Sequence, residues 1–173
     1  RDLPWRCDKA PYHVWVSEIM LQQTRIEAVM GYYHRFMEAF PDVEALAAAP
    51  IEQVLKLWEG LGYYSRARNL HKAAQQVACL GGFPSSYEEI IKLPGIGDYT
   101  AGAIAAIAFG EPVTAIDGNV MRVISRIYAL EEDIMLPASK KNVKSILESV
   151  YPLGRASDFV QGLMELGELI CIP

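Results

Sequence analysis

Two carboxylates lie in sequence surroundings where a carboxylate can take part in chemistry. The first, Glu18, falls in the run of residues 14–21, where apolar side chains flank it on nearly every face of a predicted helix. A buried carboxylate is costly unless it is paired with a cation or protonated. Glu18 could therefore form an internal salt bridge, or it could act as a general acid, which is worth roughly 10²–10⁴-fold in rate. The pattern alone leaves both interpretations open.

The second carboxylate, Asp117, opens the segment Asp117-Gly118-Asn119-Val120. An aspartate in this place is typical of a helix N-cap, where its side chain accepts a hydrogen bond from a backbone N–H. A carboxylate held at a helix start can also stabilise positive charge that develops on a sugar in a transition state. The pattern is compatible with either role.

A turn between two predicted helices has the sequence Leu93-Pro94-Gly95-Ile96-Gly97. Its glycines let the backbone approach a partner closely, and the next helix begins with free N–H groups. Such a turn suits a DNA phosphate, which is bound without regard to base sequence. It could equally be a compact corner between helices. Gly95, Ile96 and Gly97 are thus candidate phosphate-binding residues.

The composition indicates a soluble intracellular protein, and we expect a cytoplasmic location. Half of the 173 residues are hydrophobic, no apolar run is long enough for a membrane span, and three scattered cysteines do not predict disulfides. The net charge of −5 argues mildly against a nucleic-acid partner. Phosphate binding depends on local clusters, however. Basic residues gather without acidic neighbours around Arg66 and Arg68, and again at residues 140–144, although such runs can also be solvated helix faces.

Helix signals recur along the whole chain and predict an all-α fold of about nine or ten helices joined by short loops. Pro11 and Pro50 suit first helical turns, and Gly81 and Gly82 suit a helix end. The remaining expected starts are a capping box at Thr24–Glu27 and N-caps at Asp42, Ser65, Ser85 or Ser86, Asp117, Ser139, and Ser157 or Asp158. An alanine-rich helix should follow the glycine turn, over about residues 99–109.

Several blocks resemble the adenine DNA glycosylases of the MutY type, within the endonuclease III-like helix-hairpin-helix superfamily. The blocks are LPWR (3–6), WVSEIMLQQT (15–24), WEGLGYYSR (58–66), PGIGDYTA (94–101), DGNV (117–120) and MELG (164–167). The second and third are specific to this branch, whereas the glycine turn is shared across the superfamily. The resemblance implies two helical lobes in a catalytic domain over residues 1–173. These would be a six-helix barrel over about 14–112 and an iron–sulfur-type lobe of 1–13 with 113–173.

The resemblance also implies a substrate and a division of roles. The partner would be double-stranded DNA with adenine mispaired with 8-oxoguanine or guanine, bound by a monomer that flips the adenine out. Glu18 would protonate the adenine, and Asp117 would stay ionised and stabilise the oxocarbenium-like sugar. The other assigned residues are Tyr99 and Asn119 as catalytic support, Gln23 and Tyr63 inserted into the duplex, Arg66 at the DNA, and Trp5, Arg6, Leu21 and Gln161 in the base pocket. Core packing or simple solvation is the alternative for each pocket residue.

Members of the resembling family hold a [4Fe–4S] cluster through four cysteine thiolates, and Cys171 matches the first of them. Cys7 and Cys79 match no ligand of the family, and residue 173 ends the sequence two positions after Cys171. One thiolate cannot replace four. We therefore expect a cluster in the longer parent protein and an absent or incomplete one in this fragment.

Two other functions fit parts of the pattern. An endonuclease III-like glycosylase for oxidised pyrimidines would also cut the strand, through a lysine at the position that Tyr99 fills here. A non-catalytic helix-hairpin-helix module would need the glycine turn but would have no use for Glu18 and Asp117. Because Tyr99 cannot form a Schiff base, we expect a monofunctional glycosylase.

Overall fold

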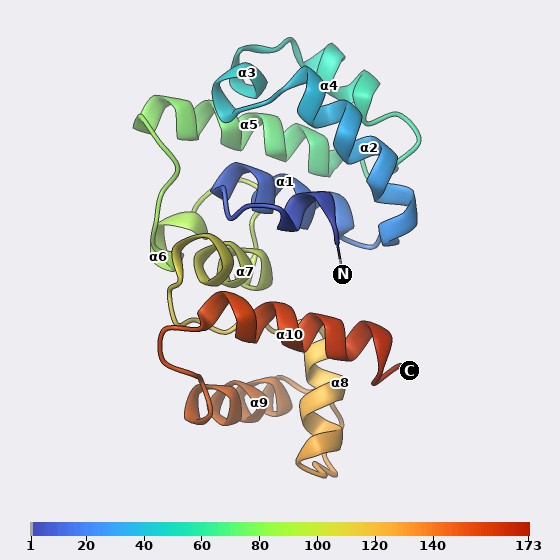
Figure 1. The fold of residues 1–173 in the computed structure, drawn as a ribbon, viewed down its shortest axis with the longest axis vertical. Coiled ribbons are helices and arrows are strands. Elements are labelled where there is room, and N and C mark those ends of the chain that lie inside the picture. The colour runs from blue at the N-terminus through green and yellow to red at the C-terminus, as the bar shows by residue number, and fades with distance from the viewer. Residues whose placement is uncertain (1) are drawn as a thin grey trace. The chain divides into compact units, whose positions relative to one another are not determined.

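The fold of the chain is seen in a computed structural model that describes residues 2–173 (Figure 1). This part of the chain contains ten α-helices, one short 3₁₀ helix and no strand. The elements in chain order are η1 (Pro4–Arg6), α1 (Pro11–Leu21), α2 (Ile26–Ala39), α3 (Val43–Ala48), α4 (Ile51–Leu57), α5 (Ser65–Leu80), α6 (Tyr87–Ile90), α7 (Asp98–Phe109), α8 (Gly118–Ile127), α9 (Pro137–Ser149) and α10 (Ala156–Leu169). The predicted all-α class is confirmed.

The chain forms two compact units, the first ending at Ile96 and the second beginning at Gly97. The boundary therefore falls inside the glycine turn rather than near residue 112. The N-terminal strip packs in the first unit, where η1 contacts α1. The predicted lobes, 14–112 and 1–13 with 113–173, stay a prediction.

The first unit is built around α1, which packs on α2 and α5, while α3 and α4 cover the other parts of α5. Its core is aromatic: Trp15, Phe36 and Trp58 are fully buried, and Phe36 meets the Trp58 ring edge to face at a centroid separation of 5.9 Å. The hydroxyl of Tyr12 donates to the carbonyl oxygen of Phe40 over 2.9 Å, which ties α1 to the end of α2. The site-bearing helix α1 is thus buried on almost all sides.

In the second unit α10 packs against both α7 and α8, and α9 packs on α8 (Figure 1). The core joins Ile116, Val120, Met121, Ile124, Val143 and Leu147. Helix α7 is rich in alanine and glycine, so its neighbours approach closely. A Cβ at Gly102 would collide with the backbone oxygen of Thr114, in the segment that leads to α8.

The two aspartate caps are confirmed. Asp42 accepts a hydrogen bond from the N–H of Ala45 at 2.8 Å, and Asp117 accepts one from the N–H of Val120 at 2.8 Å. The predicted stop at Gly81 is also confirmed, since that residue closes α5 in the left-handed conformation.

Four predicted caps are wrong, because each helix starts one to three residues away from the expected place. Arg25 rather than Thr24 precedes α2, and Tyr64 precedes α5, which includes Ser65. Helix α9 starts at Pro137 and helix α10 at Ala156, so Ser139 and Ser157 lie inside them. Ser86 does precede α6, but its hydroxyl bonds the side chain of Glu89 instead of the backbone.

No helix within residues 2–173 is long and apolar enough to cross a membrane.

Candidate active site

Glu18 lies in the middle of α1 in the first unit and is 8% exposed. The helix residues from Val14 to Met20 are all buried, so the expected apolar surroundings of this carboxylate are present. The helix can be buried over most of its surface because α2, α5 and η1 all pack against it. This burial removes water from the carboxyl group, which is the setting in which a glutamate can deliver a proton.

Asp117 belongs to the second unit, where both of its carboxylate oxygens have defined partners. Oδ1 accepts the hydrogen bond from Val120 N–H that caps α8, and Oδ2 accepts one from the Asn119 amide at 3.1 Å. The carboxylate also lies at the positive end of the α8 dipole. The structure thus brings together Asp117 and Asn119, two of the four predicted catalytic residues, and fixes the orientation of the carboxylate.

A third residue, Arg122, extends this arrangement along α8. One of its terminal nitrogens donates to the Asn119 side-chain oxygen at 2.9 Å and to the carbonyl oxygen of Gly167 at 2.8 Å, and its Nε donates to the carbonyl oxygen of Cys171 at 2.9 Å. Arginine can serve three acceptors at once because its donors form a fixed planar fork. The end of α10 is thereby connected to Asp117 through two side chains.

Gly167 makes this connection possible by having no side chain. A Cβ at this position would lie 2.9 Å from the Asn119 Cβ, closer than real carbon contacts. Sequence reasoning missed both Arg122 and Gly167. The spacing of Asn119 and Arg122, three positions apart on one helix, was the available signal.

The glycine turn has the geometry expected of a tight corner. Gly95 adopts a positive φ of 76°, and a Cβ there would lie 2.6 Å from the Asn69 side chain, so the position requires glycine. Ile96 is buried and its N–H returns to the carbonyl oxygen of Leu93. Gly97 is exposed and immediately precedes α7, the N-terminal turn of which holds the half-buried Tyr99. Binding of a phosphate by this turn stays a prediction.

Gln23 and Tyr63, the two residues predicted to insert into a duplex, are exposed and share an unusual backbone. Their φ angles are 57° and 47°, in the left-handed region that non-glycine residues seldom adopt. Tyr63 is 61% exposed, which excludes ordinary core packing for its ring. Both side chains are available to a partner.

The contact between Arg66 and DNA stays a prediction, and the structure shows where this side chain lies in the free protein. Arg66 is only 9% exposed, and its guanidinium donates to carbonyl oxygens inside the first unit, among them those of Ile19 and Met20. Burial lowers the pKa of Arg66 by penalising the charged form. The guanidinium of Arg66 is thus engaged by acceptors inside the first unit.

The four predicted pocket residues fall in two groups. Trp5 is 5% exposed and packs edge to face on Tyr33 in the first unit, as a core residue would. Leu21 and Arg6 are half-buried in the same unit. Gln161, in the second unit, is half-buried and bonds the Ser157 hydroxyl one turn earlier in α10. Their contact with a base stays a prediction.

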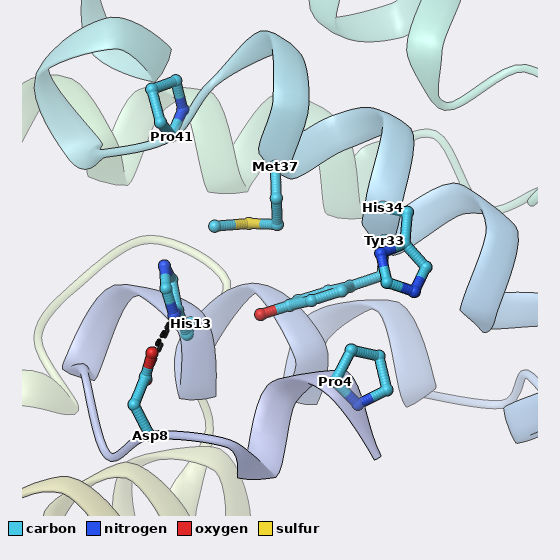
Figure 2. Close-up of a pocket in the computed structure, with 7 residues that line it drawn as sticks. All are labelled: Pro4, Asp8, His13, Tyr33, His34, Met37 and Pro41. Carbon is cyan, nitrogen blue, oxygen red and sulfur yellow. Dashed lines mark hydrogen bonds and ion pairs between the residues drawn. The ribbon is translucent and has the colours of Figure 1, made fainter.

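A shallow pocket of about 360 Å³ lies elsewhere in the first unit, and none of the predicted site residues lines it. Figure 2 shows His13 joined to Asp8 at one end and the hydroxyl of Tyr33 pointing into the pocket. The His13 Nδ1 to Asp8 Oδ2 distance is 2.9 Å, and burial is the main reason that the pKa of Tyr33 is raised. The pocket is therefore separate from the residues predicted to act on DNA.

The prediction that a [4Fe–4S] cluster is absent or incomplete here stays a prediction. Cys171 lies in the second unit, with its sulfur 3.3 Å from an Arg126 nitrogen, while Cys7 and Cys79 belong to the first unit. Within residues 2–173 no three histidine, cysteine or acidic side chains are grouped so as to hold a metal ion. A cluster needs four thiolates.

Comparison with known families identifies the fold and its general role. Residues 16–152 match the model of the HhH-GPD superfamily base excision DNA repair proteins. The chain belongs to this superfamily. The match contains Glu18, the glycine turn and Asp117, so the residues singled out above lie inside the family's own region.

The curated relatives include adenine DNA glycosylases from bacteria and animals. The chain is 44% identical to that of Buchnera aphidicola subsp. Baizongia pistaciae, over 99% of this chain and 49% of the relative. It is 43% identical to that of Homo sapiens, over 100% of this chain and 34% of the relative. The chain therefore spans half or less of the length of these relatives.

Two solved structures show the same fold. A thermostable thymine-DNA glycosylase is 32% identical, with a TM-score of 0.89 over 100% of this chain and 81% of its own. A trapped endonuclease III–DNA covalent intermediate has a TM-score of 0.82 at 23% identity, over 98% of this chain and 79% of its own. The predicted helix-hairpin-helix, endonuclease III-like architecture is confirmed.

Proposed function

We propose that this superfamily member is an adenine DNA glycosylase that removes adenine mispaired with 8-oxoguanine or guanine in double-stranded DNA. The observation that carries the proposal is the 44% identity to an adenine DNA glycosylase over almost the whole chain. The specific blocks around Glu18 and Tyr63 add to it, since they are the segments that resemble this branch of the superfamily. We also propose that the protein acts as a monomer in the bacterial cytoplasm.

In this proposal the two carboxylates have opposite tasks. Glu18 donates its proton to a ring nitrogen of the flipped adenine, so that the base leaves as a neutral group. Asp117 stays ionised and stabilises the positive charge that grows on the sugar as the N-glycosidic bond lengthens. Two hydrogen bonds and the start of α8 hold Asp117 in one orientation, so it need not reorganise during the reaction. Water then adds to the sugar and gives up a proton to the Glu18 carboxylate, which restores the acid and leaves an abasic site.

Tyr99 replaces the lysine that a bifunctional enzyme would use, so we propose hydrolysis without strand cleavage. The [4Fe–4S] cluster is proposed only for the longer protein, with Cys171 as its first ligand. No step of the reaction above depends on it.

The proposal is tested under single-turnover conditions, with the protein in excess over the DNA. The duplexes contain A:8-oxoguanine, A:G, T:G or an oxidised pyrimidine. We expect a break at the adenine only after heat or alkali, and no adduct on borohydride treatment. Release of thymine alone would instead support the activity named for the thymine-DNA glycosylase relative. A break without alkali would support an endonuclease III-like lyase, and binding without any excision would support a non-catalytic module.

A further inference from the structure

The guanidinium of Arg66 caps the C-terminal end of α1. Its Nη1 lies 2.9, 3.0 and 2.6 Å from the carbonyl oxygens of Ile19, Met20 and Gln22, respectively. The last carbonyl groups of a helix have no partner within the helix, and a positive charge beside them is favourable. Arg66 therefore supplies the hydrogen bonds that α1 lacks where it leads into Gln23.

The other terminal nitrogen of Arg66 serves a second segment. Nη2 lies 3.3 Å from each of three oxygens, the hydroxyl of Thr24 and the carbonyl groups of Leu61 and Gly62. The guanidinium also lies over the ring of Tyr63, 5.4 Å from its centroid. One planar group thus joins the loop after α1 to the loop before α5.

Each of the two joined loops carries one residue with a strained backbone, and each such residue is exposed. Gln23 is in the first loop, between Gln22 and Thr24, and Tyr63 directly follows Gly62 in the second. A left-handed non-glycine residue persists only where its neighbours over-determine the conformation. Arg66 bonds the residues on both sides of Gln23 and the residue before Tyr63, so it is the shared neighbour.

We propose that Arg66 is a positioning residue that holds Gln23 and Tyr63 in fixed relative positions for insertion into DNA, and that it makes no contact with DNA itself. The inference rests on the proposed function for the DNA step only, because the two joined loops are features of the free protein. The six oxygens that Arg66 bonds here belong to carbonyl groups and one hydroxyl, so towards these two loops the side chain acts as a fork of hydrogen-bond donors. Lysine, a single point donor, cannot reproduce this fork.

The first experiment needs no DNA. Amide hydrogen exchange is measured on wild type, Arg66→Lys and the matched control Arg68→Lys, which makes the same change at an exposed position of the same helix. We expect exchange in residues 21–24 and 61–64 to be at least about tenfold faster in Arg66→Lys alone. Unchanged exchange in a folded Arg66→Lys protein would overturn the proposal.

A second variant covers the case in which Arg66→Lys does not fold. Thr24→Val removes one acceptor and leaves the buried charge in place. If Arg66 couples the loops, exchange should rise by about twofold or more in residues 61–64, which are distant in sequence from the substitution. A change confined to the neighbourhood of Thr24 would contradict the coupling.

The second experiment separates positioning from general stability. Excision of adenine from an A:8-oxoguanine duplex is measured for Arg66→Lys alone and in a Gln23→Ala, Tyr63→Ala background. We expect about a tenfold loss of the single-turnover rate in the first case and less than about a twofold further loss in the second. Equal losses in both backgrounds would show a structural role only. If wild type excises nothing, the proposed function fails, and the exchange experiment alone decides the role of Arg66.

Discussion

Each unit contains an arginine that organises site residues through oxygen acceptors, and the two arginines do so in different ways. Arg66 in the first unit is almost fully buried and bonds mostly backbone oxygens of two loops. Arg122 in the second unit is half-buried and bonds a side chain, that of Asn119, as well as the backbone at Gly167. The first fixes backbone and leaves the side chains of Gln23 and Tyr63 exposed, whereas the second orients the Asn119 side chain, which in turn bonds Asp117.

This difference separates two kinds of function. A side chain that inserts into a partner needs a fixed backbone and an exposed side chain. The two loops that Arg66 joins provide both for Gln23 and Tyr63. A carboxylate that stabilises charge needs both of its oxygens oriented in advance, and that is what the chain from Arg122 through Asn119 to Asp117 provides. Substitutions near Arg66 should therefore slow excision by disturbing the insertion of Gln23 and Tyr63 into DNA, and those near Arg122 should slow it by disturbing the stabilisation of charge on the sugar.

A substitution of Glu18 tests whether the first unit serves only insertion into DNA, because the proposed mechanism gives this residue of the first unit a chemical task. We expect Glu18→Gln to fold normally and to lose adenine release by about 10²–10⁴-fold, since glutamine has no proton to donate at this position. Single-turnover excision on an A:8-oxoguanine duplex measures the loss, with a thermal melt as the control for folding. A folded variant with a near-normal rate would remove Glu18 from the reaction.

Asp117→Asn should show the second unit's role with little loss of stability. Asparagine caps helices as well as aspartate does, so the bond from Val120 N–H is kept and the free energy of unfolding should change by less than about 1 kcal/mol. The new amide would face the Asn119 amide, and the negative charge is gone. We expect about a 10²–10³-fold slower excision rate. A fall in stability of several kcal/mol would mean that the aspartate serves the fold rather than the reaction.

Two glycines of α10 allow a matched test of the connection to Asn119. Gly167→Ala places a methyl group 2.9 Å from the Asn119 Cβ, and we expect a loss of about 1–3 kcal/mol in the free energy of unfolding together with slower excision. Gly162→Ala meets nothing within 4 Å and should gain about 0.5–1 kcal/mol with unchanged excision. Urea unfolding measures both, and equal stabilities would mean that α8 and α10 can move apart freely.

A smaller effect compares one tyrosine in each unit. Tyr12→Phe removes the buried donor to the Phe40 carbonyl oxygen and should cost about 1–3 kcal/mol. Tyr151→Phe removes a half-buried donor to Val113, also at 2.9 Å, and should cost about 0.5–1.5 kcal/mol. Urea unfolding at pH 7 decides whether the order is as stated.

The second tyrosine also predicts a dependence on pH. Burial raises the pKa of Tyr151 from 10.0 to about 12. The unfolded chain then loses its proton first, so this contribution to stability is complete below pH 10 and disappears as the pH rises to about 12. The free energy of unfolding of Tyr151→Phe should therefore fall less than that of wild type as the pH rises from 10 to about 12. Parallel stability curves for wild type and variant above pH 10 would contradict the assignment.

Local sequence was enough where one side chain decides the structure by itself. Asp42 and Asp117 cap their helices because a short carboxylate reaches the backbone N–H three residues later in almost any context. Ser139 and Ser157 failed as caps because Pro137 and Ala156 can occupy earlier helical positions, and the serines were then carried into the helices. The apolar surroundings of Glu18 were predictable for a similar reason, since six of the seven other residues in the run 14–21 are apolar.

Arg66 could not be placed from the sequence because its partners are remote. It stands in a stretch free of acidic residues, which favours a phosphate-binding surface when charge is counted along the chain. Its acceptors are backbone oxygens, which every residue possesses and which no pattern distinguishes. The same holds for Gly167, where the need for glycine arises from a residue 48 positions earlier on another helix.

The hydrogen bonds of Arg66 also imply an order of steps in the folding of the first unit. Four of them span 42 to 47 residues of sequence, so the end of α1 receives them only after the chain has folded back through α2, α3 and α4. Contacts of such long range form slowly, because the entropy of closing the loop opposes them. During synthesis the carbonyl groups at the end of α1 stay in water until residue 66 has emerged, and the geometry of Gln23 is completed late.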